Sequence, residues 1–405
     1  MAADSSNKVP NVPPLRFPEF TGEWKLSTIG DECDILCGYA FDGKDILEKS
    51  GDVLLMRGIN IAEGYLRHSE DLDRFYSGPK EKLAKYVVRT GDVVIGMDGS
   101  KVGRNAATVT PKEDGAYLVQ RVCRLRSNKT NMRLLIQYIN NPKYYKYVDA
   151  VKTASAIPHI SQTDIQKFSV YLPTSKQEQD KIGNLLSFID ERIATQNKII
   201  DKLQSLMSGI TQRIRHSQGT NNVLLKDLLF ERVEKNQEQY AIHSVSVSEG
   251  VINQVEYLGR SFAATDTSHY SVVHYGDIVY TKSPTGSFPY GIVKRSWIEG
   301  NAAVSPLYGV YKPLNDDVGI YLHYYFCSPS NAQNYLHKLI QKGAKNTINI
   351  TNQRFLENYV PIPPAKALQH YVRLMTSLSE KLKFEQDIYN SLSCQKSYLL
   401  QRMFI

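Results

Sequence analysis

Two long stretches of the chain carry apolar residues at alternating spacings of four and three. The first lies within 175–215, where no proline occurs, and one polar residue, Gln196, stands in its apolar series. The second runs from Ala365 to the end, with Glu385 and Lys396 as its polar breaks. This spacing is typical of a coiled-coil seam. It predicts two long helices, each a rod of roughly 60 Å at 1.5 Å per residue.

We expect the apolar seam positions to pack between the two helices. They are Ile182, Leu186, Ile189, Ile193, Ile200, Leu203, Met207, Met375, Leu378, Leu382, Tyr389, Leu392 and Leu399. An antiparallel pair within one chain is the simplest arrangement, because each helix begins just after a predicted strand that ends in proline, at Pro173 and Pro364. A seam that meets another chain is the alternative, and the sequence leaves both open.

The rest of the chain alternates short apolar runs with glycine, proline and aspartate. The runs with the pattern of strands are 53–56, 93–95, 118–122, 240–245 and 278–280, with closing strands that end at Leu172-Pro173 and at Pro363-Pro364. The run 134–139 has a helical pattern and stops at the Asn-Asn-Pro of 140–142. Each half of the chain is therefore predicted to be α/β, of the mixed α+β kind.

The two halves also repeat the same motifs. TGDVVI at 90–95 returns as YGDIVY at 275–280, and HISQ at 159–162 returns as NITN at 349–352. A unit of nearly two hundred residues is too long for a solenoid repeat and suits a domain with a connecting helix. The chain is thus predicted to hold two similar domains separated by two long antiparallel helices, as an internal pseudo-twofold repeat.

This pattern predicts the boundaries of the parts. They are an N-terminal arm over 1–22, a first domain over 23–174, a long helix over 175–217, a second domain over 218–364 and a C-terminal long helix over 365–405. Residues 1–13 are polar and contain proline, so we expect them to form a loose arm.

Composition narrows the class of protein. The 405 residues carry a formal charge of +8, which favours an acidic partner when the charge gathers on one face. The five cysteines are scattered and complete no zinc set, so free thiols in a reducing cytosol are expected. The sequence has no apolar run long enough for a bilayer and no signal-peptide pattern. We therefore expect a soluble, cytoplasmic protein without a metal site.

Motifs of catalysis are missing from the sequence. The tetrad at 141–144, Asn-Pro-Lys-Tyr, approaches the Asn-Pro-Pro-aromatic loop of amino-methyltransferases but lacks the second proline. Because it stands where a helical pattern ends, we expect Asn141 and Pro142 to cap a helix. A phosphate-binding Gly-x-x-x-x-Gly-Lys-Ser/Thr loop is absent, and the only Glu-x-Lys, at 23–25, has no suitable aspartate before it. No catalytic residue is predicted.

Basic loops with small residues follow the same strands in both halves. Small residues allow close approach to a phosphate, and lysine or arginine supplies charge or a donor to a base edge. The candidate DNA-binding residues in these loops are Lys101, Arg104, Lys152, Thr153, Ser155, His159, Lys282, Thr285, Ser287, Lys342, Lys345 and Asn346. Ordinary solvated turns are the alternative, since lysine, glycine and serine are common there.

Several motifs together resemble one known family. They are LRFPEFTGEW at 15–24, IGD at 29–31, and HISQTD at 159–164 followed by Gln177 and Gln179. In this order, and with the two-copy layout, the chain resembles the specificity subunit of type I restriction-modification systems. Three departures stand out: 217–222 has no counterpart of Trp24, Arg354 stands where the first copy has Asp164, and Ala367 where it has Gln177.

The resemblance implies a DNA-reading subunit without catalysis of its own. Two target recognition domains would each read one half of a bipartite, asymmetric site in double-stranded DNA, with the helices setting the spacer. Two modification subunits would dock on the helices and methylate adenine with S-adenosylmethionine. Restriction subunits would join them and use ATP and Mg²⁺.

Two other functions compete with this one. A DNA adenine methyltransferase or nuclease with an unrecognised active site is the first, and a coiled-coil adaptor whose basic loops do not meet DNA is the second. Methyl transfer by the chain alone would favour the enzyme. Salt-sensitive DNA binding would speak against the adaptor.

Overall fold

The computed structural model describes residues 11–49, 51–154, 156–258, 266–342 and 348–405. Contacts divide the chain into two compact units. Unit 1 comprises 1–196 and 388–405, and unit 2 comprises 197–387. Each unit thus includes part of both long helices, whereas the sequence analysis set the helices apart from the domains. The predicted domain boundaries stay a prediction.

Unit 1 is built on a four-stranded antiparallel sheet with the strand order β2-β9-β6-β7. A second sheet has the order β3-β5-β4-β8, with β4 and β8 parallel, and β1 pairs with β10. The strands are β1 (Lys25–Thr28), β2 (Asp34–Cys37), β3 (Ile46–Leu47), β4 (Val53–Met56), β5 (Phe75–Tyr76), β6 (Val93–Gly96), β7 (Ala106–Thr108), β8 (Tyr117–Leu118), β9 (Val122–Arg126) and β10 (Ser169–Leu172). The helices are α1 (Ile29–Glu32), α2 (Met132–Ile139), α3 (Pro142–Val151) and α4 (Gln162–Lys167).

Unit 2 repeats the main sheet in the same order, β12-β19-β16-β17, and pairs β11 with β22. Its second sheet has a different order, β14-β13-β18-β15, with β13 and β18 parallel. The strands are β11 (Asn221–Leu224), β12 (Leu229–Glu231), β13 (Ile242–Ser246), β14 (Gly250–Asn253), β15 (Ser271–Val273), β16 (Ile278–Thr281), β17 (Ile292–Arg295), β18 (Ala302–Val304), β19 (Gly309–Pro313), β20 (Gln341–Lys342), β21 (Ile348–Asn349) and β22 (Tyr359–Ile362). The helices are α6 (Gln254–Leu258), α7 (Asp316–Cys327), α8 (Pro329–His337) and α9 (Asn352–Phe355). The mixed α/β class and the internal repeat are therefore confirmed.

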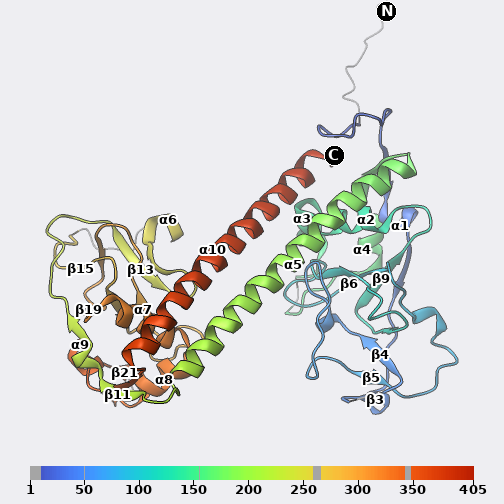
Figure 1. Cartoon of the computed structure of the whole chain (residues 1–405). Helices are drawn as coiled ribbons and strands as arrows, with labels where there is room; N and C mark the ends of the chain where they lie inside the picture. The colour runs from blue at the N-terminus through green and yellow to red at the C-terminus, as the bar shows by residue number, and fades with distance from the viewer. Residues whose placement is uncertain (1–10, 50, 155, 259–265, 343–347) are drawn as a thin grey trace, which may run out of the picture. The chain divides into compact units, whose positions relative to one another are not determined.

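The two long helices are α5 (Lys176–Ile214) and α10 (Ala365–Arg402), the green and red helices of Figure 1. Inside unit 1, Asp190 of α5 forms an ion pair with Lys396 of α10. Inside unit 2, the hydroxyls of Thr211 and Tyr371 are 2.8 Å apart. Residue numbers rise along one helix as those of their partners fall along the other, so the helices pack antiparallel.

The predicted seam residues are buried or half-buried along both helices. The buried seam residues are Ile182, Leu186, Ile189, Ile200, Leu203, Met207 and Met375. The half-buried ones are Ile193, Leu378, Leu382, Tyr389, Leu392 and Leu399. The polar seam residues Gln196 and Glu385 are buried too, and Glu385 accepts a hydrogen bond from Lys381 at 2.9 Å. A buried polar group in such a seam restricts the register.

The repeated Gly-Asp motif forms a tight turn before the central strand of each main sheet. Gly91 and Gly276 have φ of 92° and 90°, a conformation that favours glycine. Asp92 is buried and accepts two hydrogen bonds from Arg126, both at 2.7 Å. Asp277 is likewise buried and accepts two from Arg232, at 2.7 and 3.0 Å. The motif is therefore structural in both units.

Local structure corrects the sequence analysis in two places. The strand predicted over 118–122 is wrong, because Arg121 has a φ of 65° and separates β8 from β9. Residues 11–13 are not loose: Asn11 accepts a hydrogen bond from the backbone of Trp24 at 2.7 Å, and Pro13 is buried. Residues 1–10 lie outside the described part of the chain.

The predicted helix cap is confirmed. Asn141 caps α3 by accepting a hydrogen bond from the Lys143 amide, with Pro142 in the first turn. The motif at 15–24 anchors the arm in unit 1, where Arg16 donates to both carboxylate oxygens of Glu178 at 2.6 and 2.7 Å. Trp24 donates to the same carboxylate at 3.2 Å. None of the helices in the described ranges has the length and apolar character needed to cross a membrane.

Candidate nucleic-acid interface

Two of the predicted loops of unit 1 meet in the structure. The loop after β6 and the segment after α3 are joined by backbone hydrogen bonds from Gly99 to Pro158, at 3.2 Å, and from Ile160 to Met97, at 3.0 Å. Within the second segment, the hydroxyl of Thr153 is 3.0 Å from Nδ1 of His159. The fold thus brings one group of the predicted residues to a common surface: Lys101, Arg104, Lys152, Thr153 and His159.

The cations on this surface are held by two carboxylates. Asp149 forms ion pairs with Arg104 and Lys152, the latter at 2.7 Å, and Glu63 lies 3.7 Å from Lys101. The hydrogen bond from Lys152 and the charge of Arg104 hold the pKa of Asp149 below its usual value. Exposed ion pairs of this kind are weak in water. A phosphate can therefore replace the carboxylates at little cost, while they keep the cations oriented.

Gly103 has a packing role in the first loop. Its φ is 69°, and a Cβ there would lie 3.0 Å from side-chain atoms of Ile160 and Val148. From the sequence, the small residues of this loop are expected to allow close approach to a phosphate. For Gly103 the structure gives a different reason, because a side chain would push the two loops apart.

Arg121 is a candidate that the sequence analysis missed. Its side chain is 62% exposed and its Nη1 lies 3.4 Å from Asp98. It borders a cavity of about 330 Å³ whose floor includes the buried Met97 and Ile160, with His159 at its edge. A non-glycine residue at positive φ often marks a functional site. No sequence signal marks it, because the strained conformation arises from the pairing of Arg121 with Met97, whose amide donates to its carbonyl at 2.9 Å.

The corresponding loop of unit 2 is built differently. Thr285 and Ser287 are exposed on a tight turn in which Thr285 and Phe288 exchange backbone hydrogen bonds of 3.1 and 2.9 Å. Lys282 is half-buried, and this burial lowers its pKa despite the opposing charge of Glu231. Lys282 is thus less available to a ligand than the exposed Lys101 and Arg121 of unit 1.

Four predicted residues fall where the structure gives no side-chain description. Ser155, Lys345 and Asn346 lie outside the described residues, and Lys342 is described only as part of β20, which pairs with β21. The second basic loop of unit 2 therefore stays a prediction. Within the described ranges, no group of three or more histidine, cysteine, aspartate or glutamate residues is arranged to hold a metal ion.

A separate cluster in unit 2 surrounds the thiol of Cys327. The backbone amide of Arg295 donates to Nδ1 of His323 at 3.1 Å, which leaves the imidazole proton on Nε2, 3.7 Å from Sγ of Cys327. Lys294 donates to the same sulfur at 3.3 Å. Burial alone would raise the pKa of this thiol, but His323 and Lys294 outweigh it and lower the pKa to about 6.

The fold defines a class of protein: one scaffold used twice, with different loops, together with a pair of long helices. Residues 21–205 match a family model described as the type I restriction modification DNA specificity domain. The chain is therefore similar to this family over that stretch, and it resembles type I restriction-modification specificity subunits.

Individual relatives agree with this assignment. The chain is 23% identical to the type I restriction enzyme EcoBI specificity subunit of Escherichia coli over 259 residues, which are 63% of this chain and 50% of that protein. It thus spans about half the length of the curated relative it matches. The crystal structure of a type I restriction-modification S subunit from M. genitalium has the same fold, with a TM-score of 0.64 over 97% of this chain and 99% of that one, at 14% identity.

Proposed function

We propose that this chain is the DNA-reading subunit of a type I restriction-modification complex and that each unit reads one half of a bipartite, asymmetric site. The observation that carries the proposal is the repeated main sheet with unlike loops. A common scaffold gives both units the same way of presenting loops to a duplex. Different loops then read different bases, because base edges are read by side chains and not by the scaffold.

Unit 1 offers the better-defined reading surface. Lys101, Arg104 and Lys152 are suited to phosphate contacts, and Arg121 is suited to a base edge, since a guanidinium fits the two acceptors of guanine. The four cations outnumber the three carboxylates that hold them, Glu63, Asp98 and Asp149, so the surface keeps a net positive charge. Such a surface favours DNA, whose phosphates are regularly spaced along the backbone, over an acidic protein, whose charges are not.

The long helices are suited to two further roles. A helix of 39 residues is about 58 Å long, which exceeds the roughly 34 Å between half-sites one helical turn apart. In this role the helices set the unread spacer. Large apolar side chains also lie exposed on them: Phe188, Leu206, Leu374, Phe384 and Tyr398. Exposed apolar residues on a helix pair suit the docking of two modification subunits.

The chemistry would then lie on the partner chains. Modification subunits would supply S-adenosylmethionine for adenine methylation, and restriction subunits would use ATP and Mg²⁺. This division is supported by the absence of catalytic motifs from the sequence. The purified chain, incubated with DNA and S-adenosylmethionine, is expected to transfer no methyl group. Any transfer by the chain alone would favour the competing enzyme.

Sequencing methylated adenines in cells with and without this gene tests the proposal. The expected result is a two-part motif with an unread spacer that is methylated only when the gene is present. An uninterrupted motif, or an unchanged methylation pattern, would contradict it. Inserting one heptad at Gln196 tests the spacer role: the tolerated spacer is expected to change while the half-sites stay the same.

A further inference from the structure

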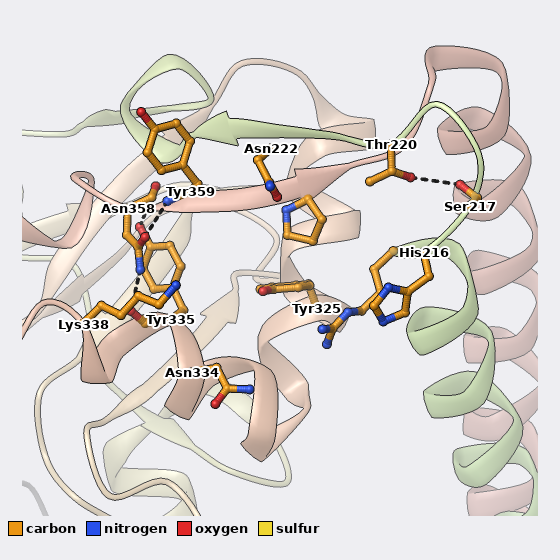
Figure 2. Close-up of a pocket in the computed structure, with 12 residues that line it drawn as sticks. His216, Ser217, Thr220, Asn222, Tyr325, Asn334, Tyr335, Lys338, Asn358 and Tyr359 are labelled. Atoms are coloured by element: carbon orange, nitrogen blue, oxygen red, sulfur yellow. Dashed lines mark hydrogen bonds between the residues drawn. The ribbon is translucent and has the colours of Figure 1, made fainter.

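A second polar site lies in unit 2, outside the predicted loops. A cavity of about 510 Å³ opens where the chain leaves α5, beside the β11–β22 pair and the end of α8. Figure 2 shows Tyr325 and Asn334 between His216 on one side and Lys338 on the other. The cavity is therefore walled by polar side chains from segments far apart in the sequence.

The charge of this cavity has one sign. Arg215, His216 and Lys338 all line it, and its lining includes no aspartate or glutamate. In the described part of the chain, none of the three has a carboxylate within ion-pair distance. Arg104 and Lys152 of unit 1, by contrast, are held by a carboxylate. Cations without a counter-charge in a concave site favour an anion.

The donors of this site are partly fixed in position. Nη1 of Arg215 donates to Oε1 of Gln212 at 3.0 Å and to Oδ1 of the buried Asn331. Its Nε is buried and has no hydrogen-bond partner among the described residues. A buried donor without a partner is costly, and a bound anion would remove that cost. The hydroxyls of Ser217 and Thr220, 3.1 Å apart, add donors at the rim.

The corresponding end of unit 1 is filled. The strand pairs β1–β10 and β11–β22 align Trp24 with Thr220 as the residues just before the first strand. Trp24 is buried, whereas Thr220 lines the cavity. After α10, the buried Phe404 packs its ring 4.6 Å from that of Tyr138. After α5, the chain has Arg215 and His216 instead. The open basic cavity is therefore particular to unit 2 and is not a by-product of the shared scaffold.

We propose that this cavity binds a phosphate group. Arginine presents a fork of donors that matches phosphate oxygens, and lysine, imidazole and hydroxyl groups can complete the contacts. The phosphate could belong to the backbone of bound DNA or to a free phosphate-bearing ligand, and both offer the same oxygens to the same donors. In the first case this site extends the proposed DNA contact of unit 2, and in the second it is independent of DNA reading.

The first experiment measures binding of inorganic phosphate. Thermal unfolding of the full chain is followed in increasing phosphate and in chloride of equal ionic strength, for the original chain and for a variant with His216→Gln and Lys338→Gln. Both residues are exposed, so the variant is expected to fold normally. Lys226→Gln is the matched control, because Lys226 is an exposed lysine of unit 2 outside the cavity. Phosphate is expected to stabilise the original chain and the control, with at least about tenfold weaker binding in the double variant.

The second experiment identifies the source of the phosphate. Binding of a labelled duplex is measured by anisotropy at several salt concentrations. If the cavity holds a DNA phosphate, the slope of log K against log salt falls in magnitude by about 1 to 2 in the double variant, with the same preference among sequences. If it holds a free ligand, the slope is unchanged while phosphate stabilisation is lost. The proposal is overturned if the double variant matches the original chain in both experiments. Sequence preference of the original chain is a separate result, which tests the proposed DNA reading and not this cavity.

Discussion

Units 1 and 2 build the same turn with different partners. In unit 1 the buried Asp92 is held by Arg126, at the end of β9, whereas in unit 2 the buried Asp277 is held by Arg232, just after β12. The strand β9 corresponds to β19 and pairs directly with the strand that follows the turn, whereas β12 lies one strand further away, beyond β19. The turn therefore requires a buried carboxylate with a guanidinium, while the origin of the guanidinium is free to change.

Differences between the units increase away from the main sheet. The second sheet keeps four strands but changes their order, and Lys101 and Arg121 are exposed in unit 1 whereas Lys282 is half-buried in unit 2. The main sheet presents loops, so its order is preserved between the copies. The loops carry the proposed recognition, so they are where two halves of an asymmetric site would require differences.

The largest expected effect follows from breaking one buried ion pair at a time. Asp92→Asn and Asp277→Asn should each destabilise one unit by about 2 kcal/mol, because the buried carboxylate that accepts two hydrogen bonds from an arginine is replaced by a neutral amide. The chain has two tryptophans, Trp24 in unit 1 and Trp297 in unit 2. Fluorescence-detected urea unfolding in Trp297→Phe and Trp24→Phe backgrounds therefore follows each unit separately. Each aspartate variant should shift mainly the midpoint of its own unit, and equal shifts of both probes would show that the units unfold together.

A smaller effect is expected on DNA binding. Arg121→Gln should weaken binding of the cognate duplex about tenfold, roughly 1.4 kcal/mol, and relax the preference at one base position. The matched control is Arg89→Gln. Arg89 is 61% exposed against 62% for Arg121, and lies 3.7 Å from Asp114. Equal losses in the two variants, measured by anisotropy, would remove Arg121 from the reading surface.

Substitution of Gly103 is expected to change the stability of unit 1, by a free energy similar to that expected for DNA binding at Arg121. Gly103→Ala should destabilise unit 1 by about 1 to 2 kcal/mol, because alanine resists positive φ and its Cβ would meet Ile160 and Val148. Gly286, in the loop of unit 2, also has positive φ but has open space where a Cβ would stand. Gly286→Ala should therefore cost less. Thermal unfolding compares the two, and a larger loss at Gly286 would contradict the packing role of Gly103.

The smallest expected effect is on the reactivity of one thiol, that of Cys327. The pKa of Cys327 is lowered to about 6, so its thiolate forms as the pH rises through about 6. Because the folded chain favours the thiolate, this contribution to folding stability is lost as the pH falls through about 6. Burial raises the pKa of Cys33 to about 12. Alkylation by iodoacetamide, mapped by mass spectrometry between pH 5 and 9, should rise at Cys327 with a midpoint near 6, while Cys33 stays unreacted. A midpoint near 9 at Cys327 would contradict the role of His323 and Lys294.

Periodic features were predictable from the sequence, and features that depend on distant contacts were not. The seam from Ile182 to Ile214 follows a regular spacing, so α5 and α10 could be predicted nearly to their ends. The conformation of Arg121 could not be predicted, because its carbonyl pairs with Met97, which follows the distant strand β6. The partners of Asp92 and Asp277 were also hidden, since each arginine is brought in by sheet pairing. The basic cavity requires the end of α5 and the end of α8 to meet, which no local pattern indicates.

The most direct test of two unlike reading units is to map methylated adenines in cells that carry the original gene or the Arg121→Gln variant. The account predicts a two-part motif in the original. In the variant, one half of the motif should become less specific, while the other half and the spacer stay unchanged. Simultaneous change of both halves, or a motif without an unread spacer, would contradict the account.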